Sequence, residues 1–429
     1  MATYIFVTFA ITAILGFPIW AVLSISSFVA LTLGSNTPII VVVQRMFTAT
    51  DSFPLLAVPL FMVAGNLMET GGISRRLINF CNSVLGWMPG GLGMAAILTC
   101  MFFAAISGSG PATVAAIGGI MIPEMEKAGY DKAFSAALMA VAGAIGVIIP
   151  PSIPMVNFGV VGSVSIATLF AAGFGPGILV GLALMFVTFV TAKKHGYGLA
   201  VQQKFSIINV LKELKSAFWA LLMPVIILGG IYGGIFTPTE AAAVAVIYGF
   251  LVGLVIHREL DIKRIPELFM SAGKSTAMVM MIIAAASGFG WILTSARIPD
   301  VIAAAMLSIS SSKIVILLLI NIMLLIVGCL METTAAIIIL TPIFLPIVTQ
   351  LGVDPVHFGI IMVVNLAIGM STPPLGVNLF VGCGIAKISI EQITKAIIWL
   401  LIANIIALFV ITYIPAISMF IPRMMGLAA

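Results

Sequence analysis

Apolar stretches long enough to cross a membrane recur along this chain from its first residues to its last. A helix needs roughly 20 apolar residues to span the hydrocarbon core of a bilayer. Backbone amides and carbonyls find no water in that core, so a run of this length must satisfy them within its own helix. The pattern therefore predicts an all-α polytopic membrane protein.

The composition excludes a soluble fold. Of 429 residues, 62% are hydrophobic and only 8% are charged, whereas soluble domains carry about 25% charged residues. No polar block is large enough for a separate domain, so we expect 1–429 to form a single integral membrane domain. The net charge of +5 comes from basic residues in short connections, which indicate orientation and not a nucleic-acid partner. The four cysteines, Cys81, Cys100, Cys329 and Cys383, have no metal-ligand or redox spacing.

Basic residues in the connections predict the orientation in the membrane. Arg75–Arg76 and the lysines and arginines at 193–215 and 258–264 should face the cytoplasm. We expect the first run, Tyr4–Leu33, to cross as one helix, which places the N terminus on the cytoplasmic side and gives nine crossings. An amphipathic linking segment at about 193–218 is predicted to lie at the membrane surface.

The sequence contains an internal repeat. At an offset of 223, residues 120–159 align with 343–382 without a gap, and 12 of the 40 positions are identical. The matched backbone-shaping residues include Pro123 with Pro346, Gly129 with Gly352, and Pro150-Pro151 with Pro373-Pro374. Five predicted crossings separate the copies, so they have opposite orientations, as in secondary transporters. Repeat one is predicted at about 1–192 and repeat two at about 219–429.

Each repeat contains an apolar run that prolines interrupt. The first run, 130–160, has three prolines within Gly146–Pro154, and the second run, 356–385, contains Pro373-Pro374. Proline removes an amide donor and clashes with a preceding carbonyl, so neither run continues as one helix. Unpaired carbonyls at mid-membrane depth need a cation, a solute or water. We expect two broken helices that form cation sites, and a simple proline kink is the alternative.

Before each broken helix, small and polar residues interrupt another apolar run. In the first, 91–125, the interruption is Ile106–Pro111, and in the second, 301–350, it is Gly328–Thr334. These patterns predict two re-entrant helical hairpins. Small residues also serve helix–helix packing in membranes, and this alternative stays open.

A few polar side chains near these breaks are candidate solute ligands. Glu332 is a carboxylate in a long apolar stretch, where an ionisable group is a functional candidate, although a structural role beside a hydroxyl or arginine is equally compatible. The candidate solute ligands are Ser109, Asn157, Glu332 and Asn378. Apart from Glu332 there is almost no buried carboxylate or histidine to relay protons, so sodium is the expected coupling ion.

Five motifs spread over the chain carry a family resemblance. They are Ser107–Thr113, Gly146–Pro154, Phe236–Ala241, Glu332–Pro342 and Gly369–Pro374. With these motifs the chain resembles the large M subunit of tripartite ATP-independent periplasmic (TRAP) transporters, of the dicarboxylate-transporter type. The resemblance implies an elevator mechanism in a bacterial inner membrane, a small four-helix Q subunit and a soluble periplasmic binding protein. It also implies a carboxylate solute, with sialic acid favoured and a C4-dicarboxylate next.

The resemblance further implies two sodium sites. The first would be shaped by Ser107, Gly146, Ile149 and Pro151, and the second by Gly328, Gly369, Thr372 and Leu375. The internal offset agrees, because it pairs Gly146 with Gly369 and Pro151 with Pro374. Family members often carry an acidic residue in the first hairpin, where this chain has Thr113 or its neighbours.

Other function classes fit the sequence less well. A channel needs a continuous polar pore, whereas this sequence has two separate, symmetry-related helix breaks. An intramembrane enzyme needs paired aspartates, a metal motif or a Ser-Lys dyad, and the sequence contains none of these. The nearest rival is a one-component elevator-type carboxylate/sodium symporter, which would transport its solute without a binding protein.

Overall fold

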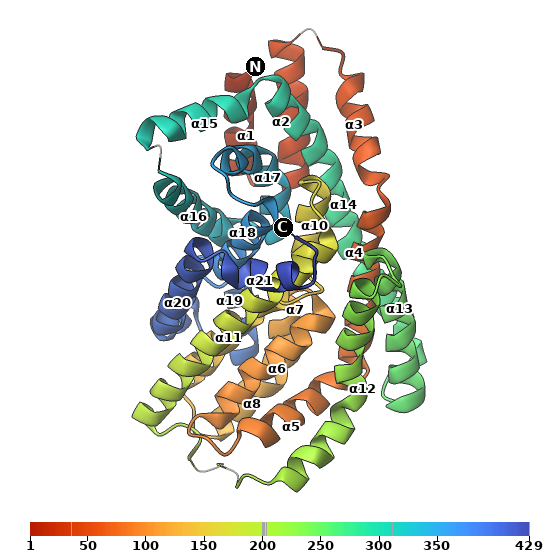
Figure 1. Ribbon diagram of the computed structural model, residues 1–429, viewed down its shortest axis with the longest axis vertical. Helices are drawn as coiled ribbons and strands as arrows, with labels where there is room; N and C mark the ends of the chain where they lie inside the picture. Colours follow the sequence, from red (N-terminus) through yellow and green to blue (C-terminus); the bar gives the residue numbers. More distant parts are fainter. Residues whose placement is uncertain (36, 200–201, 203, 311, 429) are drawn as a thin grey trace.

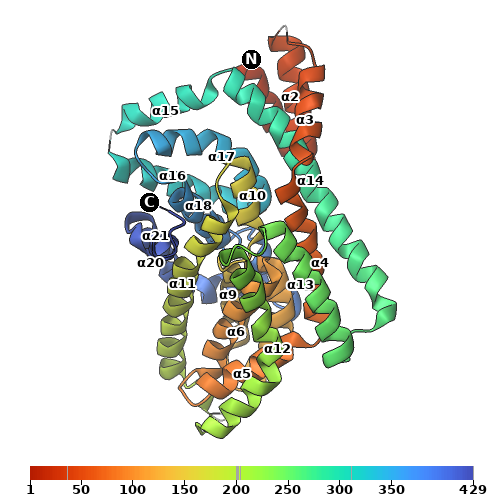
Figure 2. The ribbon, with the colours of Figure 1, turned by 45° about the vertical axis from the view of Figure 1, so that its right-hand side comes forward.

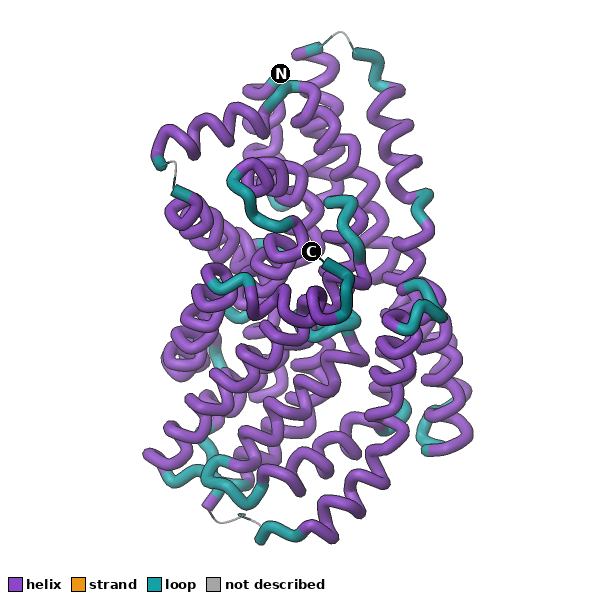
Figure 3. The backbone as a smooth tube through the Cα atoms, in the orientation of Figure 1, coloured by secondary structure: helices purple, strands orange, loops and turns teal. Residues whose placement is uncertain are grey.

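The protein is built from helices arranged around two hairpins (Figure 1). The computed structural model describes residues 1–35, 37–199, 202, 204–310 and 312–428, and every regular element in these ranges is helical (Figure 3). Eight helices in this described part are long and apolar enough to cross a membrane. The predicted all-α membrane fold is confirmed.

The helices of repeat one come first in the chain. They are α1 (Ala2–Ile14), α2 (Ile19–Gly34), α3 (Ile40–Thr50), α4 (Ala57–Thr70), α5 (Ile73–Leu85), α6 (Gly91–Ser107), α7 (Gly110–Thr113), α8 (Gly119–Lys127), α9 (Lys132–Gly143), α10 (Ile153–Val161) and α11 (Ile166–His195). The short helical turns η1 (Phe53–Leu56), η2 (Val114–Gly118) and η3 (Ala144–Val147) join or extend them.

Repeat two follows with the same kinds of element. Its helices are α12 (Ile207–Tyr232), α13 (Pro238–Leu251), α14 (Ile265–Ser295), α15 (Ile298–Ile309), α16 (Lys313–Leu330), α17 (Thr333–Gln350), α18 (Pro355–Gly369), α19 (Val377–Ala386), α20 (Ile390–Tyr413) and α21 (Ala416–Met424), with the turns η5 (Val252–Ile256) and η6 (Ile262–Arg264).

The two repeats correspond element by element. Adding 223 to the bounds of α6 gives 314–330, against Lys313–Leu330 for α16. Adding it to 110–127, from the start of α7 to the end of α8, gives the bounds of α17. By the same offset α5 corresponds to α15, and these two helices lie at opposite ends of the molecule (Figures 1 and 2). The predicted inverted repeat, with its two hairpins and two broken helices, is confirmed.

The helices form two bodies, as an elevator-type fold requires. The first, here the scaffold, contains α1–α4 and α12–α14, with the long α14 packed along α2, α3 and α4 (Figure 2). The second, the transport body, contains α6–α11 and α16–α21, in which α6 packs on α9 and α16 on α18. The helices α5 and α15 each connect a scaffold helix to a hairpin.

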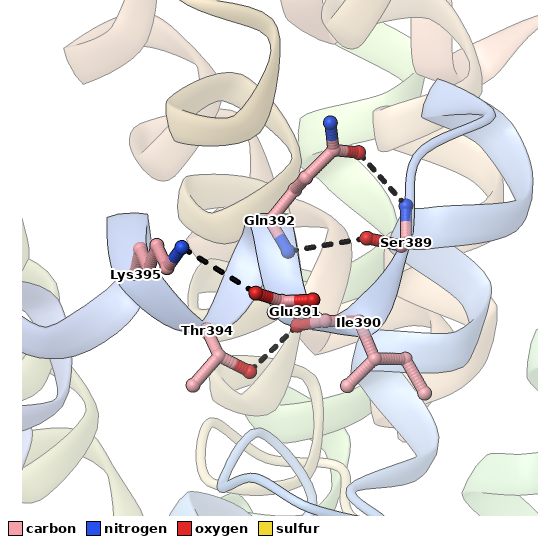
Figure 4. Close-up of polar contacts among 6 residues, drawn as sticks. All are labelled: Ser389, Ile390, Glu391, Gln392, Thr394 and Lys395. Atoms are coloured by element: carbon pink, nitrogen blue, oxygen red, sulfur yellow. Dashed lines mark hydrogen bonds and ion pairs between the residues drawn. The ribbon is translucent and has the colours of Figure 1, made fainter.

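Polar side chains cap the helices at matching places in the repeats. The Asp131 carboxylate accepts a hydrogen bond from Phe134 N at 2.8 Å, and the Asp354 carboxylate accepts one from Val356 N at 2.8 Å. At the start of α20, Ser389 and Gln392 cap each other's backbone amides (Figure 4). A side-chain acceptor at this position satisfies amides that the first helical turn leaves unpaired.

The structure differs from the prediction at the N terminus. The run Tyr4–Leu33 is two helices, because the chain turns at Gly16 (φ 78°) and Pro18 cannot continue α1. The chain then returns to its start, so that a β-carbon on Gly34 would lie 2.9 Å from Met1 Cα. The N terminus and α5 lie at opposite ends of the molecule (Figure 1). The prediction that Tyr4–Leu33 crosses once, with the N terminus on the side of Arg75, is therefore wrong.

Two predicted boundaries also change. The second hairpin begins at Lys313 and not at 301, because residues 298–309 form the separate helix α15. Ser310 Oγ accepts a hydrogen bond from Ser312 N at 3.0 Å, a local turn that competes with a continuous helix. The linking segment 193–218 is not a separate surface helix. Its first residues end α11 and its last residues begin the continuous helix α12, which packs against α5.

Candidate functional site

The tip of the first hairpin lies directly on the first helix break. The chain reverses at Gly108 (φ 59°), between α6 and α7. Ile153 N donates a hydrogen bond to Gly108 O at 3.4 Å, and a β-carbon on Gly108 would lie 3.0 Å from Pro151 O. A larger residue at this position would be strained by its positive φ and would press on the carbonyl of the break.

Hydroxyl and carbonyl oxygens gather at this tip. The hydroxyls of Ser107 and Thr113 are 2.9 Å apart, and Thr113 Oγ1 donates to Ser109 O at 2.8 Å. Gly146 of the broken helix closes the cluster, because a β-carbon there would lie 2.5 Å from Thr113 Oγ1 and 2.7 Å from Ser109 O. The structure thus brings Ser107 and Gly146 together, through Thr113.

The break itself presents free carbonyl groups. No backbone amide of the described residues donates to the carbonyl oxygen of Ile149 or of Pro151. The side chain of Ile149 packs against Gly177 of α11, which holds this part of the break in place. Unpaired buried carbonyls are costly, and a bound cation would satisfy them.

The second hairpin meets the second break in a related way. A β-carbon on Gly369 would lie 2.5 Å from Gly328 C, so α16 and α18 touch backbone to backbone. Cys329 Sγ donates to Thr372 O at 3.2 Å. These contacts bring Gly328, Gly369 and Thr372 together, whereas the side chain of Leu375 is 48% exposed.

A cavity of about 300 Å³ lies between the two hairpin tips and the scaffold. It is lined by Met62 of α4, by Lys274, Ser275, Met278 and Val279 of α14, by Gly108, Ser109, Glu332, Thr333 and Thr334 of the tips, and by Val147, Ile153, Pro154 and Met370 of the broken helices. We call it the central cavity. Ser109 and Glu332 are equivalent at the offset of 223, and both are predicted solute ligands that line it.

The two predicted asparagines are not among the residues that line the central cavity. Asn378 is buried, and its Nδ2 donates to Ala140 O at 3.1 Å. Asn157 is also buried, and neither of its amide atoms has a hydrogen-bond partner in the described part of the chain. Both side chains lie inside the transport body.

Comparison with known proteins identifies the family. Residues 6–417 match the family model described as the DctM component of tripartite ATP-independent periplasmic transporters. The chain belongs to this DctM family. The family is one of transporter permeases and not of enzymes.

Named DctM-family relatives are similar over most of this chain. It is 43% identical to the C4-dicarboxylate TRAP transporter large permease protein DctM of Pseudomonas aeruginosa, over 90% of each protein. It is 37% identical to the sialic acid TRAP transporter large permease protein SiaM of Vibrio cholerae, over 95% of each. It is 51% identical to the isethionate TRAP transporter permease protein DctMQ of Oleidesulfovibrio alaskensis, over 96% of this chain and 65% of that longer protein.

A solved structure shares the fold of this DctM-family chain. The YdaH transporter of Alcanivorax borkumensis superposes with a TM-score of 0.64, over 90% of this chain and 89% of that chain. The two sequences are 15% identical, so the likeness concerns the fold alone.

One cavity residue of this DctM-family chain was not predicted from the sequence. Lys274 lines the central cavity from the scaffold, together with Ser109 and Glu332 of the tips. A signal was present, because Lys274 lies inside the long apolar helix α14, where an ionisable side chain is a functional candidate. Residue patterns could not show that this helix faces the hairpins.

Proposed function

We propose that this chain is the large permease subunit of a sodium-coupled TRAP transporter, which imports a small carboxylate across a bacterial inner membrane. The observation that carries the proposal is the central cavity, which lies where both hairpin tips and both broken helices meet the scaffold. Elevator transport moves such a site past a fixed scaffold, and solute sites of inverted-repeat transporters lie at broken helices.

The oxygen clusters support sodium as the coupling ion. The first proposed site contains Ser107, Gly146, Ile149 and Pro151, where hydroxyls and unpaired carbonyls gather. The second contains Gly328, Gly369, Thr372 and Leu375. Carbonyl oxygens of unwound helices are typical sodium ligands in such transporters.

We also propose the two partners that a tripartite system implies. A small four-helix Q subunit would pack beside this chain, and a periplasmic binding protein would deliver the solute. The name DctMQ of the isethionate relative and its greater length support a partner subunit. Sialic acid and a C4-dicarboxylate, the solutes named for two other relatives, are the first carboxylates to test.

The test is uptake by vesicles that contain this chain, its small partner and, in one arm, the binding protein. Uptake should follow an inward sodium gradient at fixed pH and should need the binding protein. Sialic acid, succinate and isethionate are the three labelled solutes.

Two results would contradict parts of the proposal. Equal uptake with potassium in place of sodium would exclude sodium coupling. Equal rates with and without the binding protein, at one solute concentration, would exclude the tripartite arrangement and leave a one-component symporter.

A further inference from the structure

The central cavity is lined by one cationic and one anionic side chain, which come from different bodies of the protein. Lys274 belongs to α14 of the scaffold, and Glu332 belongs to the tip of the second hairpin. No ion pair joins the two side chains in the described part of the chain. Neither charge is therefore neutralised by the other, and both line the space that a solute would occupy.

The position of Lys274 is unusual for a lysine. It is the tenth residue of α14, which places it about 14 Å along the helix axis from the first residue. A lysine this far from a helix end in a membrane faces a polar cavity or a partner charge. Here it faces the cavity beside Ser275, whereas Met62 and Met278 make an apolar wall.

Glu332 is hydrogen-bonded within its own tip. Its Oε2 accepts a hydrogen bond from Ala335 N at 3.1 Å, which caps α17, and Thr334 also donates to this carboxylate. A carboxylate has lone pairs for further hydrogen bonds, so it can also accept one from a solute hydroxyl, whereas its charge repels a second acidic group.

From this pair of charges we infer the chemical class of the solute, an inference that rests on the proposed function. The solute is a small monoanion with a hydroxyl group at its other end. Its carboxylate or sulfonate lies at Lys274, and its hydroxyl donates to Glu332. Dicarboxylates are disfavoured, because their second acidic group would lie beside the Glu332 carboxylate. Sialic acid, a hydroxylated monocarboxylate, belongs to this class, and succinate does not.

The test measures binding to the permease complex in nanodiscs with sodium present, through the shift in melting temperature with ligand concentration. The matched probes are isethionate (2-hydroxyethanesulfonate) with ethanesulfonate, and 3-hydroxypropionate with propionate. Within each pair only the hydroxyl differs, and between the pairs the acidic group is a sulfonate or a carboxylate. Succinate is the dianionic probe. We expect each hydroxy acid to bind at least tenfold more tightly than its partner without the hydroxyl, and at least tenfold more tightly than succinate.

Three variants assign the roles. Lys274→Gln should weaken the binding of both hydroxy acids at least tenfold, and Lys274→Arg should retain most of the binding. Glu332→Gln should lower the preference for the hydroxy acids over succinate at least tenfold. The control is Lys263→Gln in η6, outside the cavity lining, which should change nothing. The melting temperature without ligand identifies any variant that fails to fold.

The possible outcomes separate this inference from the function it rests on. Tighter binding of succinate than of both hydroxy acids, unchanged binding in Lys274→Gln, or no binding of any probe would overturn the inference. Sodium-driven uptake of a dicarboxylate in the vesicle assay would at the same time leave the proposed function in place. Failure of sodium-driven uptake for every solute would instead count against the function.

Discussion

The two hairpin tips have the same place in the inverted repeat but different chemistry. Tip one is neutral, turns at a glycine with positive φ, and forms hydrogen bonds among Ser107, Ser109 and Thr113. In tip two Glu332 takes the place of Ser109 and caps α17, and Thr333 and Thr334 follow it directly. The repeat thus keeps the backbone path, while single side chains make the chemistry of the two tips different.

The contacts behind the tips differ as well, and this difference predicts the largest effect. A β-carbon on Gly369 would lie 2.5 Å from Gly328 C and 2.6 Å from Gly328 Cα, which are both backbone, whereas one on Gly146 would lie 2.5 Å from the Thr113 hydroxyl and 2.7 Å from the backbone oxygen of Ser109. Gly369→Ala should therefore lower the free energy of unfolding by about 1–3 kcal/mol, typical of overpacking, and Gly146→Ala by somewhat less, because one of its two closest contacts is a side chain. Melting temperatures in detergent measure both.

Each repeat offers a matched control for this comparison. Gly384 in α19 and Gly119 in α8 have no atom within 4 Å of an added β-carbon. Alanine at these positions should leave the melting temperature unchanged or slightly raised, because alanine favours helices. If Gly369→Ala melted like Gly384→Ala, the backbone contact at tip two would not be restrictive.

Much of this arrangement was predictable, because prolines and glycines shape the backbone directly. The breaks at Pro150-Pro151 and Pro373-Pro374 and the hairpin tips follow from residues that cannot continue a helix. The path of ordinary apolar segments was not predicted. The hydropathy of Tyr4–Leu33 shows that the run is long enough for one span, but it does not reveal the turn within it. Hydropathy also does not show that α14 packs beside the hairpin tips. Lys274 was missed for this reason.

The oxygen clusters predict the next largest effect, on the proposed sodium coupling. Ser107→Ala removes a hydroxyl from the cluster with Thr113, and losing one cation ligand should raise the sodium concentration for half-maximal uptake about tenfold, or about 1.4 kcal/mol. Thr372→Val should have a smaller effect, because the Thr372 hydroxyl donates to Ile368 O of its own helix at 2.8 Å, so its loss disturbs no second hydroxyl as the loss of Ser107 does. Sodium titrations of uptake compare the two.

A buried serine outside the site is the control for these titrations. Ser135 Oγ donates to Asp131 O at 2.9 Å within α9, away from the oxygen cluster. Ser135→Ala should leave the sodium dependence unchanged. A larger shift for Thr372→Val than for Ser107→Ala would reverse the proposed division between the tips.

The last membrane helix of each repeat predicts a smaller effect, on stability. α20 begins with a reciprocal cap between Ser389 and Gln392 (Figure 4), whereas at the start of α11 the Ser165 hydroxyl accepts from Thr168 N at 3.3 Å. Ser389→Ala should cost about 1 kcal/mol of unfolding free energy and Ser165→Ala somewhat less.

The exposed pair Glu391–Lys395, at 3.4 Å, serves as control, and Lys395→Ala should cost less than about 0.5 kcal/mol. Equal melting temperatures for Ser389→Ala and Lys395→Ala would show that the cap contributes little.

The smallest expected effect concerns the connecting helices α5 and α15. At the start of α5, Arg76 forms an ion pair with Glu259 at 2.7 Å, and His257 Nδ1 lies 2.9 Å from Gly71 O. No ion pair is formed at the start of α15 in the part of the chain that the structure describes. The α5 end alone should therefore respond to pH.

The direction of this response follows from His257. Burial, the largest cause, lowers the pKa of His257, while the hydrogen bond to Gly71 O raises it by a smaller amount. The folded protein therefore binds this proton less readily than the unfolded chain does. The contribution of His257 to stability is fully present above the ordinary histidine pKa, and it is lost as the pH falls from there through the lowered value.

The melting temperature should fall more between pH 7 and pH 5 in the unaltered protein than in His257→Gln, by about 1 °C or less, because the site is partly exposed. The comparison variant is Arg76→Gln, which keeps the histidine but removes the ion pair and a positive charge that adds to the lowering of the His257 pKa, so it should lower the melting temperature slightly and retain most of the pH dependence. An identical pH dependence in His257→Gln and the unaltered protein would show that the two connecting helices do not differ in this respect.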